Sequence, residues 1–185
     1  CVRARNELEG EQRVPMLVKL APDLTDDDLK EIAKVLMKSD IDGIVVTNTT
    51  NQRPNDLISK HRVEGGGLSG APVRDKSTEV IRTLFALTDG KIPIIGVGGV
   101  GSGHDAYVKL KAGASLVQVY SMMVYKGPGV VSKIRKELAE LMLQNGQRSM
   151  EDVVGQDHDD IFWRKREEHA ERARKKIASV AVIEP

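Results

Sequence analysis

The sequence predicts an α/β protein, namely the C-terminal half (strands 5–8) of a (β/α)8 TIM barrel. Short apolar runs alternate four times with helical patterns, and regular βα alternation implies a parallel sheet. The chain has 185 residues, whereas a whole barrel needs about 250. Polar residues follow the predicted strand ends, which is where barrel enzymes carry their active sites. A doubly wound sheet is the competing architecture.

The first half of the chain contains two predicted strands. Residues 14–20 form an apolar run with Lys19 near its carboxyl end, and residues 43–47 form the second run. Between these runs, apolar residues recur at helical spacing. Thr25, followed three residues later by an aspartate, has the outline of a capping box and starts this helix. Residues 1–13 are expected to be the remnant of an N-terminal helical segment.

The second half repeats the pattern after a long loop at residues 52–74, and a connection of this length is usually functional. The loop contains the glycine-rich stretch at residues 65–70. Helix and strand patterns then alternate, beginning and ending with a helix, at residues 77–87, 92–95, 106–111, 115–120 and 130–145. Residues 14–160 are therefore predicted to form one barrel unit, namely half of a TIM barrel domain.

A glycine-rich turn at residues 96–101 follows the third predicted strand, and Ser102 or Asp105 is the expected N-cap of the next helix. Glycine lets the backbone approach a ligand closely, and N–H groups at a helix start suit a phosphate. The turn also fits the dinucleotide fingerprint G-x-G-x-x-G, but the next strand, at residues 115–120, offers no carboxylate for a ribose. A phosphate cradle is therefore favoured, and a tight turn without a ligand is the alternative.

The composition fits a soluble globular chain, with 40% hydrophobic and 30% charged residues and a net charge of +1. One cysteine excludes an intrachain disulfide, and no apolar run approaches the length of a membrane helix. The four histidines lack metal-ligand spacing, so no metal is expected. Residues 161–185 are richer in basic than in acidic residues and are predicted to be a charged tail of unknown role, in the form of a solvated helix. Contact with an anionic surface or nucleic acid is the alternative for this tail.

Five segments together resemble class 2, or quinone-dependent, dihydroorotate dehydrogenase. They occur in the family's order and at its spacing, and the similarity extends over residues 14–158. The segments are residues 18–24 (VKLAPDL), 46–50 (VTNTT), 66–70 (GGLSG), 94–100 (IIGVGGV) and 113–120 (GASLVQVY). The resemblance implies a TIM barrel with bound FMN. The family oxidises dihydroorotate to orotate in pyrimidine biosynthesis and passes the electrons to a quinone.

The resemblance also implies roles for individual residues. Lys19 is the expected catalytic residue, beside the flavin edge on which negative charge develops. Asn48 and Thr49 are expected to bind the substrate. The residues expected to bind FMN are Lys19, Thr47, Gly70, Gly98, Gly99, Tyr120 and Ser121.

The sequence also departs from the family pattern. The catalytic base, a serine on an earlier strand, has no counterpart, and neither has the N-terminal helical pair that admits the quinone. The chain by itself is therefore expected to be inactive. The membrane surface is an expected partner through that missing N-terminal segment, at the mitochondrial inner membrane in a eukaryote, and no nucleic acid is expected. Two alternatives stay open, a non-redox barrel enzyme for a phosphorylated substrate and an inactive truncated product.

Overall fold

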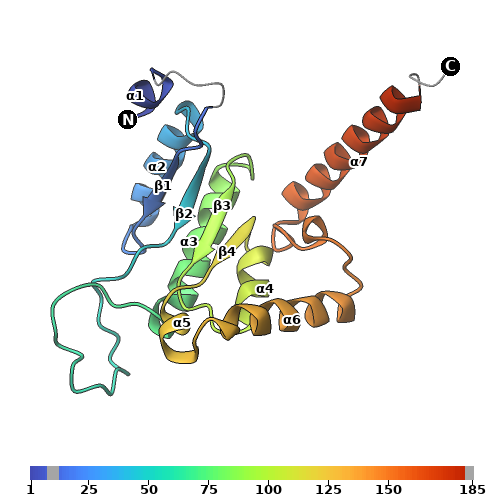
Figure 1. Ribbon diagram of the computed structural model, residues 1–185. Helices are drawn as coiled ribbons and strands as arrows, with labels where there is room; N and C mark the ends of the chain where they lie inside the picture. Colours follow the sequence, from blue (N-terminus) through green and yellow to red (C-terminus); the bar gives the residue numbers. More distant parts are fainter. Residues whose placement is uncertain (8–12, 182–185) are drawn as a thin grey trace.

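The computed structural model describes residues 1–7 and 13–181, and at its centre lies a parallel sheet of four strands (Figure 1). The strands lie side by side in chain order, and each is parallel to its neighbour. A doubly wound sheet has a reversal of strand order, and this sheet has none. The predicted parallel α/β class is therefore confirmed, with strands β1 (Leu17–Leu20), β2 (Gly43–Val46), β3 (Ile94–Val97) and β4 (Leu116–Gln118).

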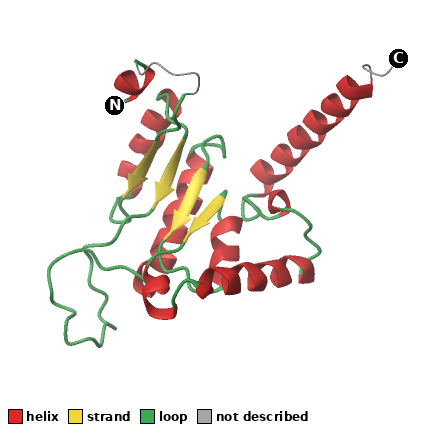
Figure 2. Cartoon of the chain, viewed as in Figure 1, coloured by secondary structure: helices red, strands yellow, loops and turns green. Residues whose placement is uncertain are grey.

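Helices cover one face of this sheet (Figure 2). They are α2 (Asp26–Lys38), α3 (Arg74–Leu87) and α4 (Gly103–Lys111), which follow the first three strands. The core between these helices and the strands is mainly aliphatic, as the low aromatic content requires, and its fully buried members include Ile44, Ile81, Leu84 and Ile94. A smaller cluster joins α4 to α6 (Gly129–Gln144) through Val100, Ala106, Val130 and Ile134.

The opposite face of the sheet is more open. The strand register aligns Lys19, Val45, Ile95 and Leu116 in one row across the four strands. None of these four residues is buried, and Leu116 is 62% exposed, whereas Ile44, on the covered face, is 0% exposed. Parallel sheets are normally covered on both faces. Within the described residues, this sheet is covered on only one.

The third strand lies two residues later than the predicted range of 92–95, so Gly96 belongs to the strand and not to the turn. A Cβ at Gly96 would lie 3.0 Å from side-chain atoms of both Ala114 and Ile81. Glycine therefore lets the strand approach its neighbours closely. The turn itself is Gly98-Gly99, and the prediction that it begins at Gly96 is wrong.

Three other predicted boundaries are corrected. β1 does not include residues 14–16, because Pro15 has no N–H to donate to a strand ladder. β4 is shorter than the predicted range of 115–120, and the chain after it forms a short helix, α5 (Ser121–Lys126), that the sequence did not predict. The long loop ends at a 3-10 helix (Ala71–Val73) that leads directly into α3, so α3 begins earlier than predicted.

The helices α2 and α4 both begin at a predicted cap residue. Thr25 Oγ1 accepts a hydrogen bond from Asp28 N at 3.2 Å, and Thr25 N donates to the Asp28 carboxylate at 2.9 Å. This reciprocal pair is the predicted capping box of α2. For α4 the N-cap is Ser102 and not Asp105, because Ser102 Oγ accepts from Asp105 N at 3.1 Å. The glycine turn therefore runs directly into a capped helix start.

The charged C-terminal segment forms a helix, α7 (Asp159–Ala181), as predicted. Its first two turns pack against the rest of the fold, since Phe162 is 5% exposed and Lys165 Nζ donates to a carbonyl in the loop after α3 at 2.5 Å. The later turns extend away from the sheet (Figure 1). Parts of both predicted terminal segments, residues 8–12 and 182–185, lie outside the described residues.

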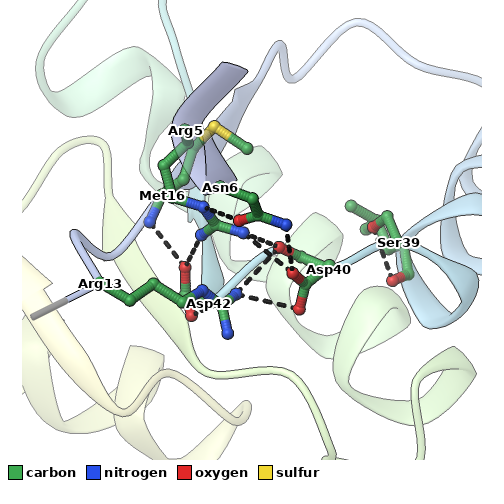
Figure 3. Close-up of polar contacts among 8 residues, drawn as sticks. Arg5, Asn6, Arg13, Met16, Ser39, Asp40 and Asp42 are labelled. Atoms are coloured by element: carbon green, nitrogen blue, oxygen red, sulfur yellow. Dashed lines mark hydrogen bonds and ion pairs between the residues drawn. The ribbon is translucent and has the colours of Figure 1, made fainter. Parts of the chain in front are cut away.

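A buried arginine ties the N-terminal helix, α1 (Val2–Asn6), to the amino ends of the strands (Figure 3). The Arg5 side chain is 7% exposed, and its guanidinium lies 2.7 Å from Asp42 Oδ2 and donates to Asp40 O at 2.7 Å. Arg13 lies 2.9 Å from Asp40 Oδ1 and 3.1 Å from Asp42 Oδ1. The Asp42 carboxylate also accepts from the backbone N–H before β1 at 2.7 Å. This hydrogen bond and the two guanidinium groups hold the pKa of Asp42 below its ordinary value.

Arg5→Met is expected to lower the free energy of unfolding by about 2 kcal/mol. Hydrogen bonds to charged groups contribute about 1.5–3 kcal/mol, and this variant leaves the partly buried Asp42 with fewer partners. Arg3→Met is the matched control because the Arg3 side chain is 93% exposed, and its expected effect is below about 0.5 kcal/mol. Urea denaturation of the purified chain measures the free energy of unfolding of both variants. Equal unfolding midpoints for the two variants would contradict the anchoring role of Arg5.

Candidate functional site

The carboxyl ends of the four strands and the segments that follow them line one cavity of about 310 Å³. Figure 1 shows the strands pointing toward the end of the molecule where α5 and the loop between β2 and α3 lie. The volume is at the lower end of the range of small-molecule sites, about 300–1,000 Å³. All the residues predicted to bind a cofactor or substrate line this cavity, namely Lys19, Thr47, Asn48, Thr49, Gly70, Gly98, Gly99, Tyr120 and Ser121. The structure thus brings these residues together, and their individual roles stay predictions.

The segment after β2 is held between the neighbouring strands. Thr47 is 2% exposed and its N–H donates to Val97 O at 2.9 Å, while Asn48 N donates to Leu20 O at 2.7 Å. The Asn48 Oδ1 atom accepts from Thr49 N at 2.9 Å. In the described part of the chain the Asn48 amide NH2 group has no acceptor. It is therefore available to a ligand in the cavity.

The glycine-rich loop positions Thr49. A Cβ at Gly67 would lie 1.9 Å from Thr49 Oγ1, so a side chain there would displace the threonine. Thr50 and Leu68 form an antiparallel bridge with N···O distances of 3.0 and 2.8 Å. The bridge brings the loop back to the end of β2, and Gly70, with a φ of 82°, then lies at the cavity wall.

The turn after β3 is formed by Gly98 and Gly99, whose φ values of 125° and 68° favour glycine. A Cβ at Gly98 would lie 3.0 Å from Ser77 Cβ, and one at Gly99 would lie 2.4 Å from Arg74 Cβ. The turn is therefore in direct contact with the first turn of α3, a packing reason for glycine that the sequence did not indicate. Neither glycine N–H has an acceptor among the described residues. Two backbone donors at the cavity wall can therefore bind an anion.

The fourth strand contributes the edge of the cavity. Ser121, the first residue of α5, donates its hydroxyl to Ser69 Oγ at 3.2 Å. A Cβ at Gly70 would lie 3.7 Å from Ser121 Cβ, so the loop and α5 meet here. Tyr120 is 73% exposed. The Ser121 hydroxyl thus joins α5 to the loop at this edge of the cavity.

Lys19 lies at the other side of the cavity, on the open face of the sheet in register with Val45. It is exposed, and it forms no ion pair with any residue that the structure describes. An ammonium group without a carboxylate partner keeps its charge available for a ligand. The chemistry of the cavity wall therefore combines one cation with amide, hydroxyl and backbone N–H donors.

Sequence reasoning missed Asp23, which binds the segment that directly follows the cavity residues Asn48 and Thr49. Its carboxylate accepts from Thr50 Oγ1 at 2.5 Å, from Asn51 N at 2.7 Å and from Lys76 Nζ at 2.9 Å. Burial acts to raise the pKa of Asp23, but these three donors outweigh it, and the pKa lies below its ordinary value. Asp23 thereby joins the turn after β1 to the long loop and to α3. A polar residue in a turn is common, so the sequence carried no distinctive signal for this role.

Across residues 1–7 and 13–181, no three histidine, cysteine, aspartate or glutamate side chains are grouped so that they could hold a metal ion. The helices in these two ranges include none that combines the length and the apolar character needed to cross a membrane. The single cysteine, Cys1, is exposed.

The fold and the cavity define a parallel α/β protein with a polar binding site at the carboxyl ends of its strands. The family model for dihydroorotate dehydrogenase matches residues 3–142. The chain belongs to this family.

Individual relatives agree with this assignment. The chain is 49% identical over 148 residues to dihydroorotate dehydrogenase (quinone) of Rhodospirillum rubrum, covering 80% of this chain and 40% of that protein. It is 50% identical over 157 residues to the mitochondrial dihydroorotate dehydrogenase (quinone) of Mus musculus, covering 85% of this chain and 40% of that protein. The crystal structure of DHODH from Eimeria tenella in complex with ferulenol superposes with a TM-score of 0.78 at 43% identity, covering 80% of this chain and 39% of that chain. The resemblance is confirmed, and the chain spans about 40% of the length of these relatives.

Gly99→Ala is expected to lower the free energy of unfolding by about 2–3 kcal/mol. The added Cβ would overlap Arg74, and alanine disfavours the positive φ. Gly101→Ala is the matched control, because its Cβ would meet mainly the flexible end of Met122, and its expected cost is below about 1 kcal/mol. Urea denaturation compares the two variants. If Gly99→Ala loses no more unfolding free energy than Gly101→Ala, the turn does not depend on its contact with Arg74.

Proposed function

We propose that residues 14–160 supply strands five to eight of a quinone-dependent dihydroorotate dehydrogenase barrel. With these strands the chain would contribute the phosphate-binding and substrate-binding side of an FMN site. Residues from all four strand ends, which match the family and are far apart in the sequence, line one cavity. This arrangement supports the proposal. In barrel enzymes the phosphate site commonly uses the loops after strands seven and eight. Here those loops would be the ones after β3 and β4.

The residues present fit the phosphate of FMN. The N–H groups of Gly98 and Gly99 have no acceptor among the described residues, and the Ser121 hydroxyl lies at the same cavity. Backbone N–H groups in a glycine turn before a helix start are typical phosphate ligands. Thr47, Gly70 and Tyr120 would complete the cofactor wall. The chemistry that FMN supplies when bound is uptake of a hydride from dihydroorotate and later transfer of the electrons to quinone.

Lys19 is proposed to stabilise the negative charge that develops on the flavin ring during substrate oxidation. An ammonium without a carboxylate partner is suited to this task, since its positive charge is not neutralised and can stabilise a negative charge that develops beside it. Asn48 and Thr49 are proposed to orient dihydroorotate, whose amide and carboxylate groups need donors and acceptors in fixed places. The base that removes the substrate proton would come from the other half of the barrel.

The proposed partners follow from the same assignment. Dihydroorotate and orotate would bind at the cavity, and quinone and a membrane surface would be reached through an N-terminal segment outside this chain. The mouse relative is named as mitochondrial, which supports the mitochondrial inner membrane as the location in a eukaryote. The flanking residues 1–13 and 161–185 are proposed to lie outside the barrel unit. An inactive product, or an enzyme for another phosphorylated substrate, would share the phosphate cradle but not the activity.

Activity is tested in a chimera in which this chain replaces the matching 148 residues of the Rhodospirillum rubrum relative. We expect dihydroorotate-dependent quinone reduction by the chimera. Lys19→Ala is expected to lower kcat at saturating dihydroorotate by about 100-fold or more, with a small change in KM, because its charge acts mainly in the transition state. Lys34→Ala, which removes a solvent-exposed lysine of α2, is the matched control and should leave the rate unchanged.

Two results would contradict the proposal. A chimera that binds FMN but does not oxidise dihydroorotate would exclude this activity and favour the alternatives. An unchanged kcat in Lys19→Ala would remove Lys19 from the mechanism while leaving the family assignment intact.

A further inference from the structure

One fully buried lysine lies outside the lining of the cavity. Lys109 of α4 is 0% exposed. Its ammonium donates to Arg74 O at 3.1 Å, to Ser77 Oγ at 3.1 Å and to Thr78 Oγ1 at 2.9 Å. All three acceptors belong to the first turns of α3. The three protons of the ammonium therefore each have an acceptor.

The same first turn of α3 supports the glycine turn. Ser77 Oγ accepts from Lys109 and donates to Val97 O at 2.6 Å, directly before the glycines. Ser77 and Arg74 are also the residues that a Cβ at Gly98 or Gly99 would strike. Lys109 therefore holds in place the part of α3 that packs against Gly98 and Gly99, the two residues whose N–H groups lie at the cavity.

The charges around Lys109 give it a second effect. The titratable groups facing it are Arg74 and Asp75 of α3 and Asp105 of α4, while β3 and β4 carry no titratable side chain. The Arg74 guanidinium lies 3.1 Å from Asp75 and 3.2 Å from Asp105. Without Lys109 these three side chains carry a net charge of −1 beside the turn, and the Asp105 carboxylate, 12% exposed, is screened by solvent much less than that of Asp75, 91% exposed. This net charge would disfavour an anion. With Lys109 protonated the group is neutral.

We propose that Lys109 is a positioning residue for the phosphate of FMN, holding the Gly98-Gly99 turn against α3 and cancelling the net negative charge of the neighbouring side chains. The inference rests on the proposed function, since it takes the ligand of this turn to be a phosphate. The preference of the site for FMN over riboflavin, which lacks the phosphate, then depends on the charge of Lys109.

The charge can be titrated in an accessible pH range. Burial lowers the pKa of Lys109 to about 8, with Asp105 and Asp75 opposing this shift and Arg74 adding to it. The second phosphate pKa is about 6, so the phosphate of FMN stays doubly charged above pH 7. Ionisation of the flavin ring affects both ligands and cancels in their ratio. As the pH rises through about 8, the lysine loses its charge and the FMN preference should fall.

A purely structural role predicts a different pH response. The pKa of Lys109 in the fold is lower than the ordinary value of 10.5 expected in the unfolded chain. Between these two values the unfolded state binds more protons than the folded state, so this group makes the fold more stable as the pH rises. A structural role alone would therefore raise stability at pH 9.5 and leave the ratio of the two flavin affinities constant.

The test is titration of FMN and riboflavin into the full chain, purified without flavin, at pH 7.0 and 9.5. In the wild type we expect FMN to bind more tightly at pH 7.0 and the ratio of affinities to fall about tenfold or more by pH 9.5. Lys109→Met keeps the length of the side chain without its charge, and it should lower the FMN affinity at pH 7.0 by about tenfold or more while changing riboflavin binding less than about twofold. For Lys109→Met, the ratio of the FMN affinity to the riboflavin affinity should not depend on pH. Lys111→Met, which removes a lysine of the same helix that lies 3.2 Å from Asp157, is the matched control and should behave as the wild type.

The outcomes separate this inference from the proposed function. A ratio near one for the wild type at pH 7.0, or no measurable FMN binding, would overturn both. A clear FMN preference that is the same at both pH values would overturn the role of Lys109 alone. That second outcome is read in the wild type and does not depend on whether Lys109→Met folds.

Discussion

The close contact between the Gly98-Gly99 turn and the first turn of α3 determines how the rest of the candidate site is arranged. At Gly99 a single added carbon would meet the backbone of Arg74, so the end of β3 and the start of α3 cannot shift independently. Lys109 adds hydrogen bonds from α4 to the same turn of α3. The two glycine N–H groups are therefore fixed before any ligand arrives, which reduces the ordering cost of binding.

The two ends of the sheet differ in how their polar groups are satisfied. At the amino ends of the strands, the guanidinium of Arg5 is buried and paired with two aspartates. At the carboxyl ends, within the described residues, Lys19 has no carboxylate partner and the Asn48 amide has no acceptor. Among the described residues, paired charges thus stabilise the amino ends of the strands, whereas donors without a partner lie at the carboxyl ends. Functional sites are where such local departures from full satisfaction are expected.

Local patterns account for what the sequence predicted well. The βα alternation and the capping box at Thr25 depend on residues a few positions apart, and short motifs carried the family resemblance. Contacts between distant segments account for what was missed. Gly96 and Gly99 are required by helices packed against them, and Lys109 finds its acceptors 31 to 35 residues away. No local pattern distinguishes such a lysine from an exposed one. The residues of α5 likewise show no pattern that predicts a helix.

Amide NMR can test whether the Gly98-Gly99 turn binds the phosphate of a flavin cofactor. ¹H–¹⁵N correlation spectra of the labelled full chain are recorded with FMN and with riboflavin. We expect the amide protons of Gly98 and Gly99 to move downfield with FMN and to stay in place with riboflavin, because only FMN offers a charged acceptor. Equal shifts with both ligands, or FMN-specific shifts confined to residues outside the turn, would contradict phosphate binding by this turn.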